Sequence, residues 1–209
     1  MMQKDLFSHA DTDTDTDLRL QNAVVHYYPD FVENQEVVYQ QLVDELCWQQ
    51  DTIGMYGKSV LIPRLNAWYG DASADYSYSG IALKPVAWTP LLNSLKTSLE
   101  SFLGSRFNSV LANYYRHKND SVAWHSDDEQ ELGFQPVIAS LSFGQTRRFS
   151  LKHKFDPSIK TVHINLQGGS LLLMAGDTQS HWRHQVAKMT TPCEGRINLT
   201  FRHVVSGKR

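Results

Sequence analysis

The chain has 209 residues, of which 41% are apolar, so one domain with one sizeable core is the natural expectation. A formal net charge of −2 argues against a strongly basic nucleic-acid binder. Two cysteines give no disulfide framework, and no ~20-residue apolar span or secretory signal is apparent, so we expect a cytoplasmic protein without a membrane anchor.

The first 20 residues form an acidic stretch of low complexity. It carries five aspartates, Asp5, Asp11, Asp13, Asp15 and Asp17, and too few apolar groups to bury a core. We therefore expect residues 1–20 to be a flexible tail and residues 21–209 to form a single domain.

The segment from residue 21 to 108 predicts one strand and two helices around a turn-rich region. Residues 23–28 read as a strand, and Asn34 is expected to cap a helix that runs to about Trp48. Residues 51–80 are rich in turns and aromatic side chains. The buried stripe of the first helix is predicted to be Val38, Leu42 and Leu46.

The second helix has clear start and stop signals. Thr89 is the expected N-cap, Pro90 takes the first helical position, and Gly104 ends the helix. Its buried face is predicted to consist of Leu92, Leu95, Leu99, Phe102 and Leu103.

From residue 109 onward the sequence changes to short apolar or alternating runs with turn signals between them. Eight strands are predicted, over residues 109–115, 121–125, 136–142, 147–152, 161–165, 170–174, 184–187 and 197–205. This pattern is typical of a double-sheet jelly roll. The expected fold class is therefore mostly β with flanking helices (α+β), the core being a double-stranded β-helix over residues 109–205.

One strand carries a pair of metal-ligand residue types. His125 and Asp127 fall on the same face of an extended chain, because side chains alternate. A second imidazole, from His184 or the nearby His181, would complete a 2-His-1-carboxylate facial triad for Fe(II). The spacing alone does not choose between His184 and His181, and a His-x-Asp pair also occurs by chance in many proteins.

The last predicted strand has one polar face, made by Arg196, Asn198, Thr200 and Arg202. In a generic sandwich this face would meet solvent. Inside a barrel, its guanidinium groups would need an anion, and a dicarboxylate fits because Arg binds carboxylate through two parallel hydrogen bonds. In the first core strand, Asn113 and Tyr115 share a face and offer further hydrogen bonds, either to that ligand or to the protein itself.

A locally basic segment runs from Arg147 to Lys160. It holds Arg147, Arg148, Lys152, Lys154 and Lys160 against the single acid Asp156. Such a segment can steer a polyanion, although an ordinary solvated loop has the same composition.

Several motifs in order resemble the AlkB family of iron(II)- and 2-oxoglutarate-dependent dioxygenases, most closely the branch that repairs alkylated duplex DNA. The likeness covers about residues 20–205. Its motifs are Tyr56-Gly57-Lys58, Pro63-Arg64, Tyr69-Gly70-Asp71, Tyr76-Ser77-Tyr78-Ser79-Gly80, Asn113-Tyr114-Tyr115, Trp124-His125-Ser126-Asp127-Asp128-Glu129, Ser140-Leu141-Ser142-Phe143-Gly144, His181-Trp182-Arg183-His184 and Gly195-Arg196-Ile197-Asn198-Leu199-Thr200-Phe201-Arg202.

The resemblance implies a role for each motif. The iron ligands, which are also the catalytic centre, would be His125, Asp127 and His184. The residues that hold 2-oxoglutarate would be Asn113, Tyr115, Arg196, Thr200 and Arg202. The substrate-binding residues would be Tyr56, Gly57, Lys58, Tyr76, Ser77, Tyr78 and Asp128. Residues 21–108 would then supply a nucleotide-recognition lid as well as the flanking helices.

The implied reaction is oxidative demethylation of 1-methyladenine or 3-methylcytosine in DNA, with 2-oxoglutarate and O2 as cosubstrates. A methylated base must be flipped out of a duplex or taken from a single strand. Tyr76 and Tyr78 can stack on the base, Asp128 would favour its positive charge, and Tyr56 could fill the vacated stack. Only Phe155 to Lys160 follow the basic strand where the duplex-repair branch has a longer basic loop, which favours comparable handling of single strands.

Two other functions remain open at this stage. The same chemistry could act on RNA, a protein or a small molecule, although the aromatic lid and the basic segment favour nucleic acid. A noncatalytic jelly-roll binding module is the alternative from another class, and the intact triad argues against it. We expect a monomer that acts on alkylated DNA, single- or double-stranded.

Overall fold

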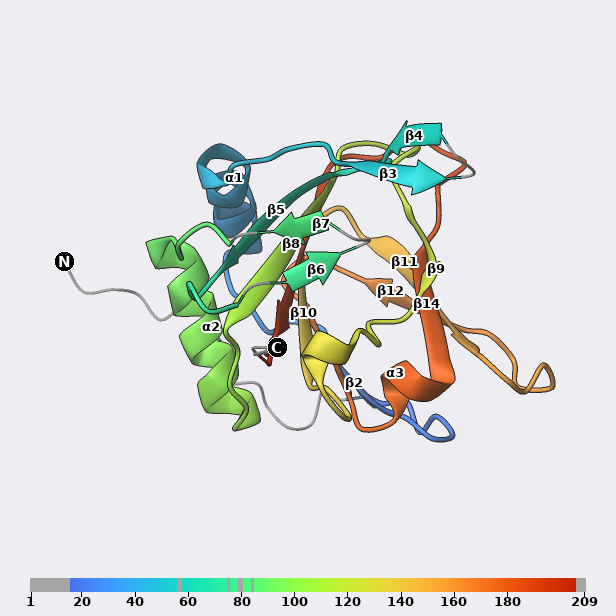
Figure 1. The fold of residues 1–209 in the computed structure, drawn as a ribbon. Helices are drawn as coiled ribbons and strands as arrows, with labels where there is room; N and C mark the ends of the chain where they lie inside the picture. The colour runs from blue at the N-terminus through green and yellow to red at the C-terminus, as the bar shows by residue number, and fades with distance from the viewer. Residues whose placement is uncertain (1–15, 56–57, 75, 79–80, 84, 206–209) are drawn as a thin grey trace.

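The computed structural model describes residues 16–55, 58–74, 76–78, 81–83 and 85–205. Two sheets form the core of the fold (Figure 1). The larger has the strand order β1-β2-β13-β10-β15-β8-β5, and the smaller has the order β12-β11-β14-β9. All pairings between these strands are antiparallel, so the predicted jelly roll is confirmed.

The eight strands expected after residue 108 are all present, with small shifts in their bounds. They are β8 (Ser109–Tyr115), β9 (Val122–His125), β10 (Ile138–Gly144), β11 (Arg147–His153), β12 (Val162–Leu166), β13 (Leu171–Ala175), β14 (Trp182–Val186) and β15 (Arg196–Arg202). The last strand ends at Arg202 rather than at 205. Two short helical turns, η2 (Gln130–Leu132) and α3 (Thr178–His181), lie between strands, and no helix of the described ranges has the length and apolarity to cross a membrane.

Regular structure begins closer to the N-terminus than the sequence predicts. Strand β1 (Thr16–Asp17) pairs with β2 (Val24–Tyr28), and Leu18 and Leu20 pack against buried apolar side chains. The predicted tail boundary at residue 20 is therefore too late, because the two leucines have a core to join. The rest of the expected tail, residues 1–15, lies outside the described residues.

Helix α1 (Gln35–Glu45) begins where expected but differs at both ends. Asn34 precedes it in the left-handed region (φ 52°), and its side chain makes no capping hydrogen bond. The helix ends at Glu45 instead of Trp48, because Leu46 turns to an extended conformation that keeps its side chain buried. The predicted buried stripe is nevertheless confirmed, since Val38, Leu42 and Leu46 are 6% exposed or less.

Helix α2 (Pro90–Leu103) follows its sequence signals closely. The Thr89 hydroxyl accepts a hydrogen bond from the Leu92 amide at 3.2 Å, and Gly104 ends the helix with a φ of 63°. Leu92, Leu95 and Leu99 are buried as predicted, but Leu103 is only partly buried and Phe102 is 41% exposed. Its ring lies at the edge of the core, in edge-on contact with two aromatic rings of the N-terminal segment.

The turn-rich region contains more regular structure than predicted. Strands β3 (Thr52–Met55) and β4 (Lys58–Leu61) form one hairpin, and β6 (Tyr76–Tyr78) and β7 (Ile81–Leu83) form another. Between them, β5 (Leu65–Gly70) pairs with β8 at the edge of the larger sheet. The two hairpins belong to neither sheet (Figure 1).

The larger sheet has one apolar face and one polar face. Ile197, Leu199 and Phe201 of β15 pack in one core cluster with leucines of both helices, which cover this face (Figure 1). The alternate residues of the same strand line a pocket that also contacts the smaller sheet. A polar face between two sheets is unusual for a sandwich core, and it indicates a ligand site.

A close backbone approach holds β10 and β15 together at Gly144. This residue has a φ of 78°, and a Cβ built there would lie 2.5 Å from the carbonyl oxygen of Gly195. We expect Gly144→Ala to destabilise the fold by about 1–3 kcal/mol or more, because it combines a left-handed conformation with a backbone clash. The melting temperature should fall by about 2–12 °C, at about 2–4 °C per kcal/mol for a chain of this size.

The matched control for this prediction is Gly54→Ala. A Cβ at Gly54 meets nothing within 4 Å among the described residues, and its φ is not in the left-handed range. Thermal unfolding of the two variants should therefore separate clearly. Equal melting temperatures would show that the Gly144 backbone can relax.

Candidate active site

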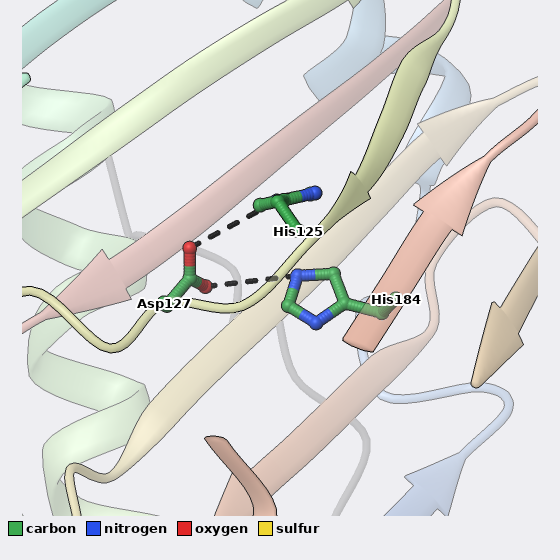
Figure 2. Close-up of side chains that lie close together, drawn as sticks. All are labelled: His125, Asp127 and His184. Atoms are coloured by element: carbon green, nitrogen blue, oxygen red, sulfur yellow. Dashed lines mark ion pairs between the residues drawn. The ribbon is translucent and has the colours of Figure 1, made fainter. Parts of the chain in front are cut away.

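Three side chains meet between the sheets at the end of the pocket nearest β9. His125 ends β9, Asp127 follows two residues later, and His184 comes from β14 (Figure 2). The Nε2 atoms of His125 and His184 lie 3.9 Å from Oδ1 and Oδ2 of Asp127, respectively. One ligand atom from each residue lies within 4.8 Å of the other two, which is the arrangement a single ion needs.

A β-bulge aims His125 into the pocket. His125 pairs with His184, and Val122 pairs with Val186, so two residues of β9 stand opposite the single Gln185 of β14. Without the extra residue, alternation would place Val122 and His125 on opposite faces. The bulge lets both side chains line the pocket.

The imidazole of His125 is oriented by its own strand. Its Nδ1 lies 2.8 Å from the carbonyl oxygen of Ala123, which can only accept, so Nδ1 donates. The tautomer then leaves the Nε2 lone pair free to face Asp127 and His184. Ligand histidines are commonly fixed by such a bond at the second ring nitrogen.

Asp127 is buried and ionised. Burial by itself would raise its pKa, but the positive charge of Arg202 and the nearby imidazoles of His184 and His125 outweigh this and lower the pKa to about 2. The Arg202 Nη2 donates to Asp127 Oδ1 at 2.8 Å. The carboxylate therefore stays charged at neutral pH, as a metal ligand must be.

His184 is held in its neutral form. Burial lowers its pKa to about 3, and the neighbouring cationic groups act in the same direction while Asp127 opposes them. Its ring stacks on Phe149 with centroids 5.2 Å apart. A neutral imidazole with a fixed ring plane is ready to donate a lone pair to a metal ion.

Gln179 of α3 supports the triad, and sequence reasoning missed it. Its Oε1 accepts a hydrogen bond from the Asp127 amide at 2.9 Å, and the side chain is buried. No local pattern marks this residue, because α3 is a single turn whose position is set by the fold. The bond fixes the backbone from which Asp127 projects.

We expect Gln179→Leu to weaken metal binding by about 10- to 100-fold, because it leaves the buried Asp127 amide without its acceptor. Titration with Mn(II) or Co(II) would measure this without turnover. Gln41→Leu on the exposed face of α1 is the control and should bind metal like the wild type. Unchanged affinity in Gln179→Leu would mean that the Asp127 backbone holds its place unaided.

The polar face of β15 forms the other side of the pocket. Arg196 Nη2 donates to Ser142 Oγ at 2.9 Å, and Asn198 Nδ2 donates to Ser140 Oγ at 2.8 Å. Thr200 Oγ1 donates to Asn198 Oδ1 at 3.0 Å. The network orders this face, but it does not use all of its donors.

Arg196 has hydrogen-bonding capacity to spare. The residue is 1% exposed, and its Nε and Nη1 find no hydrogen-bond partner among the residues that the structure describes. Burial lowers its pKa to about 10, with Tyr115 opposing the shift and Arg147 adding to it. The guanidinium is still charged at neutral pH, so a carboxylate fits this position well.

Tyr115 lies between the two sheets in contact with two guanidinium groups. The Cζ atoms of Arg147 and Arg196 lie 5.5 and 5.3 Å from its ring centroid. Arg147, the first residue of the predicted basic segment, is 1% exposed, and its Nη2 donates to the carbonyls of Asp120 and Ala187. The pocket end around Tyr115 is therefore strongly positive and suited to an anion.

Arg64 is a further pocket residue that received no role from the sequence. Its Nε donates to Asn113 Oδ1 at 2.7 Å, and both side chains line the pocket. Because Asn113 Oδ1 is used in this way, its Nδ2 donor is left to face the pocket. The Pro63-Arg64 pair just before β5 was the only sequence signal.

The predicted substrate residues are placed only in part. Tyr56 and Gly57 lie outside the described residues; Lys58 begins β4, and Tyr76, Ser77 and Tyr78 form β6. Asp128 does not line the pocket, and its Oδ2 accepts from Lys154 Nζ at 2.9 Å. His181 stays outside the triad, with Nδ1 3.2 Å from the Asp177 carbonyl.

The fold and the pocket define the class of protein. The family model of the 2OG-Fe(II) oxygenase superfamily matches residues 24–202, which include every residue of the triad and of β15. Membership implies Fe(II) with 2-oxoglutarate and O2, and the donor set agrees with this. His125, Asp127 and His184 have the ligand types for Fe(II), and the spare donors of Arg196 suit a dicarboxylate.

Curated relatives narrow the class. The chain is 43% identical over 192 residues to human alpha-ketoglutarate-dependent dioxygenase alkB homolog 3, covering 87% of this chain and 66% of that protein. It is 35% identical over 181 residues to human DNA oxidative demethylase ALKBH2, covering 82% and 69%. Within the superfamily, the chain belongs to the AlkB family, and it spans about two thirds of the length of these relatives.

Solved structures agree on the fold. The structure of OsALKBH1 matches with a TM-score of 0.60 at 18% identity, covering 88% of this chain and 98% of that one. A 2OG-Fe(II) oxygenase family oxidoreductase from Burkholderia pseudomallei gives a TM-score of 0.58 at 12% identity, covering 88% of each chain.

Proposed function

We propose that this protein removes methyl groups from N-alkylated bases in DNA, with 1-methyladenine and 3-methylcytosine as substrates. Relatives that carry the names alkB homolog 3 and DNA oxidative demethylase ALKBH2 support this choice. The observation that carries the proposal is the pocket itself. It has a 2-His-1-carboxylate triad at one end and a buried guanidinium with spare donors at the other.

In this proposal, His125, Asp127 and His184 hold Fe(II), and the far carboxylate of 2-oxoglutarate meets Arg196 and Tyr115. Asn113, Thr200 and Arg202 supply further contacts to the cosubstrate. When bound, the iron and 2-oxoglutarate use O2 to hydroxylate the N-methyl group, which then leaves as formaldehyde. The protein contributes position, charge and exclusion of water.

Substrate recognition would rest on stacking and charge. The vacated position in the base stack would be filled by Tyr56, with Gly57 and Lys58 beside it. The flipped base would be covered by Tyr76, Ser77 and Tyr78. The N-methylated rings are cationic, so Asp128 favours them over normal bases. Since Lys154 already binds Asp128, this recognition requires the ion pair to be shared or exchanged when the base enters.

The test is formaldehyde release from a 1-methyladenine oligonucleotide, single- and double-stranded, with and without Fe(II) and 2-oxoglutarate. Release that needs both, together with one succinate per formaldehyde, would support the proposal. Succinate without formaldehyde would keep the oxygenase and reject the substrate. The ratio of the two strand forms would show how the short segment after β11 affects use of duplex DNA.

Methylated RNA is the second candidate substrate, because the proposed chemistry takes place on the methylated base and does not involve the sugar. An RNA strand of the same sequence, assayed in parallel, decides between the two. Faster turnover of the RNA strand would replace DNA in the proposal. The monomeric state and the cytoplasmic location stay predictions from the sequence.

A further inference from the structure

The smaller sheet has a second face, which points away from the pocket. Arg148 and Lys152 of β11 and Arg183 of β14 are exposed, on the face opposite the pocket-lining Phe149 and His184. Ser150, between the two basic residues of β11, is buried against His163. His163 and Asn165 of β12 are exposed on the same side. The outer face is defined by Arg148, Lys152, Arg183, His163, Asn165 and Trp124 of β9, all of which are exposed.

The outer face carries only positive charge. The four strands β9, β11, β12 and β14 contain no Asp or Glu. Arg148, Lys152 and Arg183 form no ion pair with any residue in the described parts of the chain. Two of these cations, Lys152 and Arg183, are direct cross-strand partners. Like charges placed opposite each other destabilise a sheet, so this arrangement suits an external anion.

Trp124 lies on the outer face, because it directly precedes the pocket-facing His125 and side chains alternate along a strand. The bulge sets Ala123 and Trp124 opposite Gln185, whose neighbours His184 and Val186 line the pocket, so Gln185 and its partners point outward. Trp124 is 38% exposed, although tryptophan is usually well buried. It directly precedes His125 on the edge strand of this sheet. An aromatic platform therefore lies on the opposite side of the sheet from the triad, on the same face as the basic side chains.

We propose that the outer face binds the part of a single DNA strand that flanks the base held in the pocket. Trp124 would stack on a neighbouring base, and Lys152 and Arg183 would contact the phosphates that follow. Basic grooves with aromatic platforms bind single strands in this way without reading sequence. The identity of the ligand rests on the proposed function, whereas the charge and the open aromatic are features of this face alone.

The test uses the full chain and an unmodified 20-nucleotide single-stranded DNA, with binding measured by fluorescence anisotropy over a range of salt concentrations. Lys152→Gln/Arg183→Gln should lower the slope of log affinity against log salt by about 1.4, at about 0.7 per lost phosphate contact. The control Arg19→Gln/Arg106→Gln removes two exposed charges elsewhere and should keep the wild-type slope. Equal slopes for the two variants would overturn the proposal.

Stacking is tested separately with Trp124→Ala. We expect about a 5- to 150-fold loss of affinity for the unmodified 20-nucleotide strand, and a much smaller loss for a strand of the same length made entirely of abasic sites. The same loss on both strands would overturn the stacking role. Thermal unfolding should show Lys152→Gln/Arg183→Gln to be at least as stable as the wild type, because like-charge repulsion is removed.

Failure of this inference is separate from failure of the proposed function. Binding of unmodified DNA needs no methyl group, iron or 2-oxoglutarate. Formaldehyde release with no effect of the outer-face variants would reject only the outer-face site. Variant-sensitive DNA binding with no formaldehyde release would reject only the demethylase.

Discussion

Asp127→Ala should abolish turnover, with 2-oxoglutarate consumption below about 0.1% of the wild-type rate. Asp127 is the only carboxylate of the triad, and alanine leaves two neutral imidazoles that hold a divalent ion far less well. The affinity for Mn(II) or Co(II), measured by titration, should fall in parallel. Succinate formation above a few per cent of the wild-type rate, with iron added, would contradict the assignment of Asp127.

The same substitution should also destabilise the metal-free protein. It removes the carboxylate that accepts from Arg202 at 2.8 Å, and both side chains are buried. Breaking a buried pair from one side costs about 3–5 kcal/mol, or roughly 6–20 °C in melting temperature for a chain of this size. Asp44→Ala, on the exposed face of α1, is the control and should change neither stability nor metal affinity. An unchanged melting temperature in Asp127→Ala would show that Arg202 is compensated from elsewhere.

The polar face of β15 could be predicted from the sequence because its polar residues recur at every second position, and side chains alternate along a strand. Arg196, Asn198, Thr200 and Arg202 were placed on one face, and the structure puts all four on the pocket wall. The alternative, a solvent-facing polar strand, is wrong, because every residue of β15 is buried. Which residues share a face is local information. Which face encloses a pocket depends on the second sheet, and the strand sequence does not contain it.

The triad shows where simple alternation is incomplete. His125 and Asp127 were placed on one face, and they do meet, but a bulge next to His125 rather than regular alternation lets Val122 share the pocket with it. The exposure of Trp124 was not predicted, although alternation from the pocket-facing His125 already places it on the other face. A bulge depends on how β9 pairs with β14, two segments far apart in sequence.

Residues that act through distant contacts left almost no sequence signal. Gln179 reaches the Asp127 amide from a single helical turn, and Arg64 reaches Asn113 from the start of β5. The Lys154 partner of Asp128 belongs to the same group. Each pairing joins segments at least 26 residues apart, so only the assembled fold brings the partners together.

Arg196→Met should raise the KM for 2-oxoglutarate by about 100-fold or more and leave kcat within about tenfold of the wild type. In the proposed complex, the guanidinium meets the far carboxylate, remote from the methyl group that reacts, so it supplies uniform binding rather than transition-state stabilisation. Removing one side of a buried charge pair costs about 2–5 kcal/mol. Steady-state kinetics, together with direct binding of 2-oxoglutarate, would measure the effect.

The same substitution should stabilise the ligand-free protein. Without ligand, Arg196 is buried with two N–H groups that have no partner among the described residues, and methionine removes that cost while filling similar space. We expect the ligand-free variant to melt about 2–4 °C higher than the wild type, corresponding to about 1 kcal/mol. Arg106→Met, at an exposed arginine, should leave both KM and melting temperature unchanged.

The higher KM for 2-oxoglutarate and the higher melting temperature together distinguish a ligand-binding role of Arg196 from a structural one. Replacing a structural arginine would destabilise the protein and lower its activity through unfolding. A ligand-binding arginine gives a more stable protein with weaker cosubstrate affinity, because the fold tolerates an unsatisfied charge only where a ligand satisfies it. A lower melting temperature with unchanged KM would place Arg196 in the scaffold, and the dicarboxylate would then need another anchor.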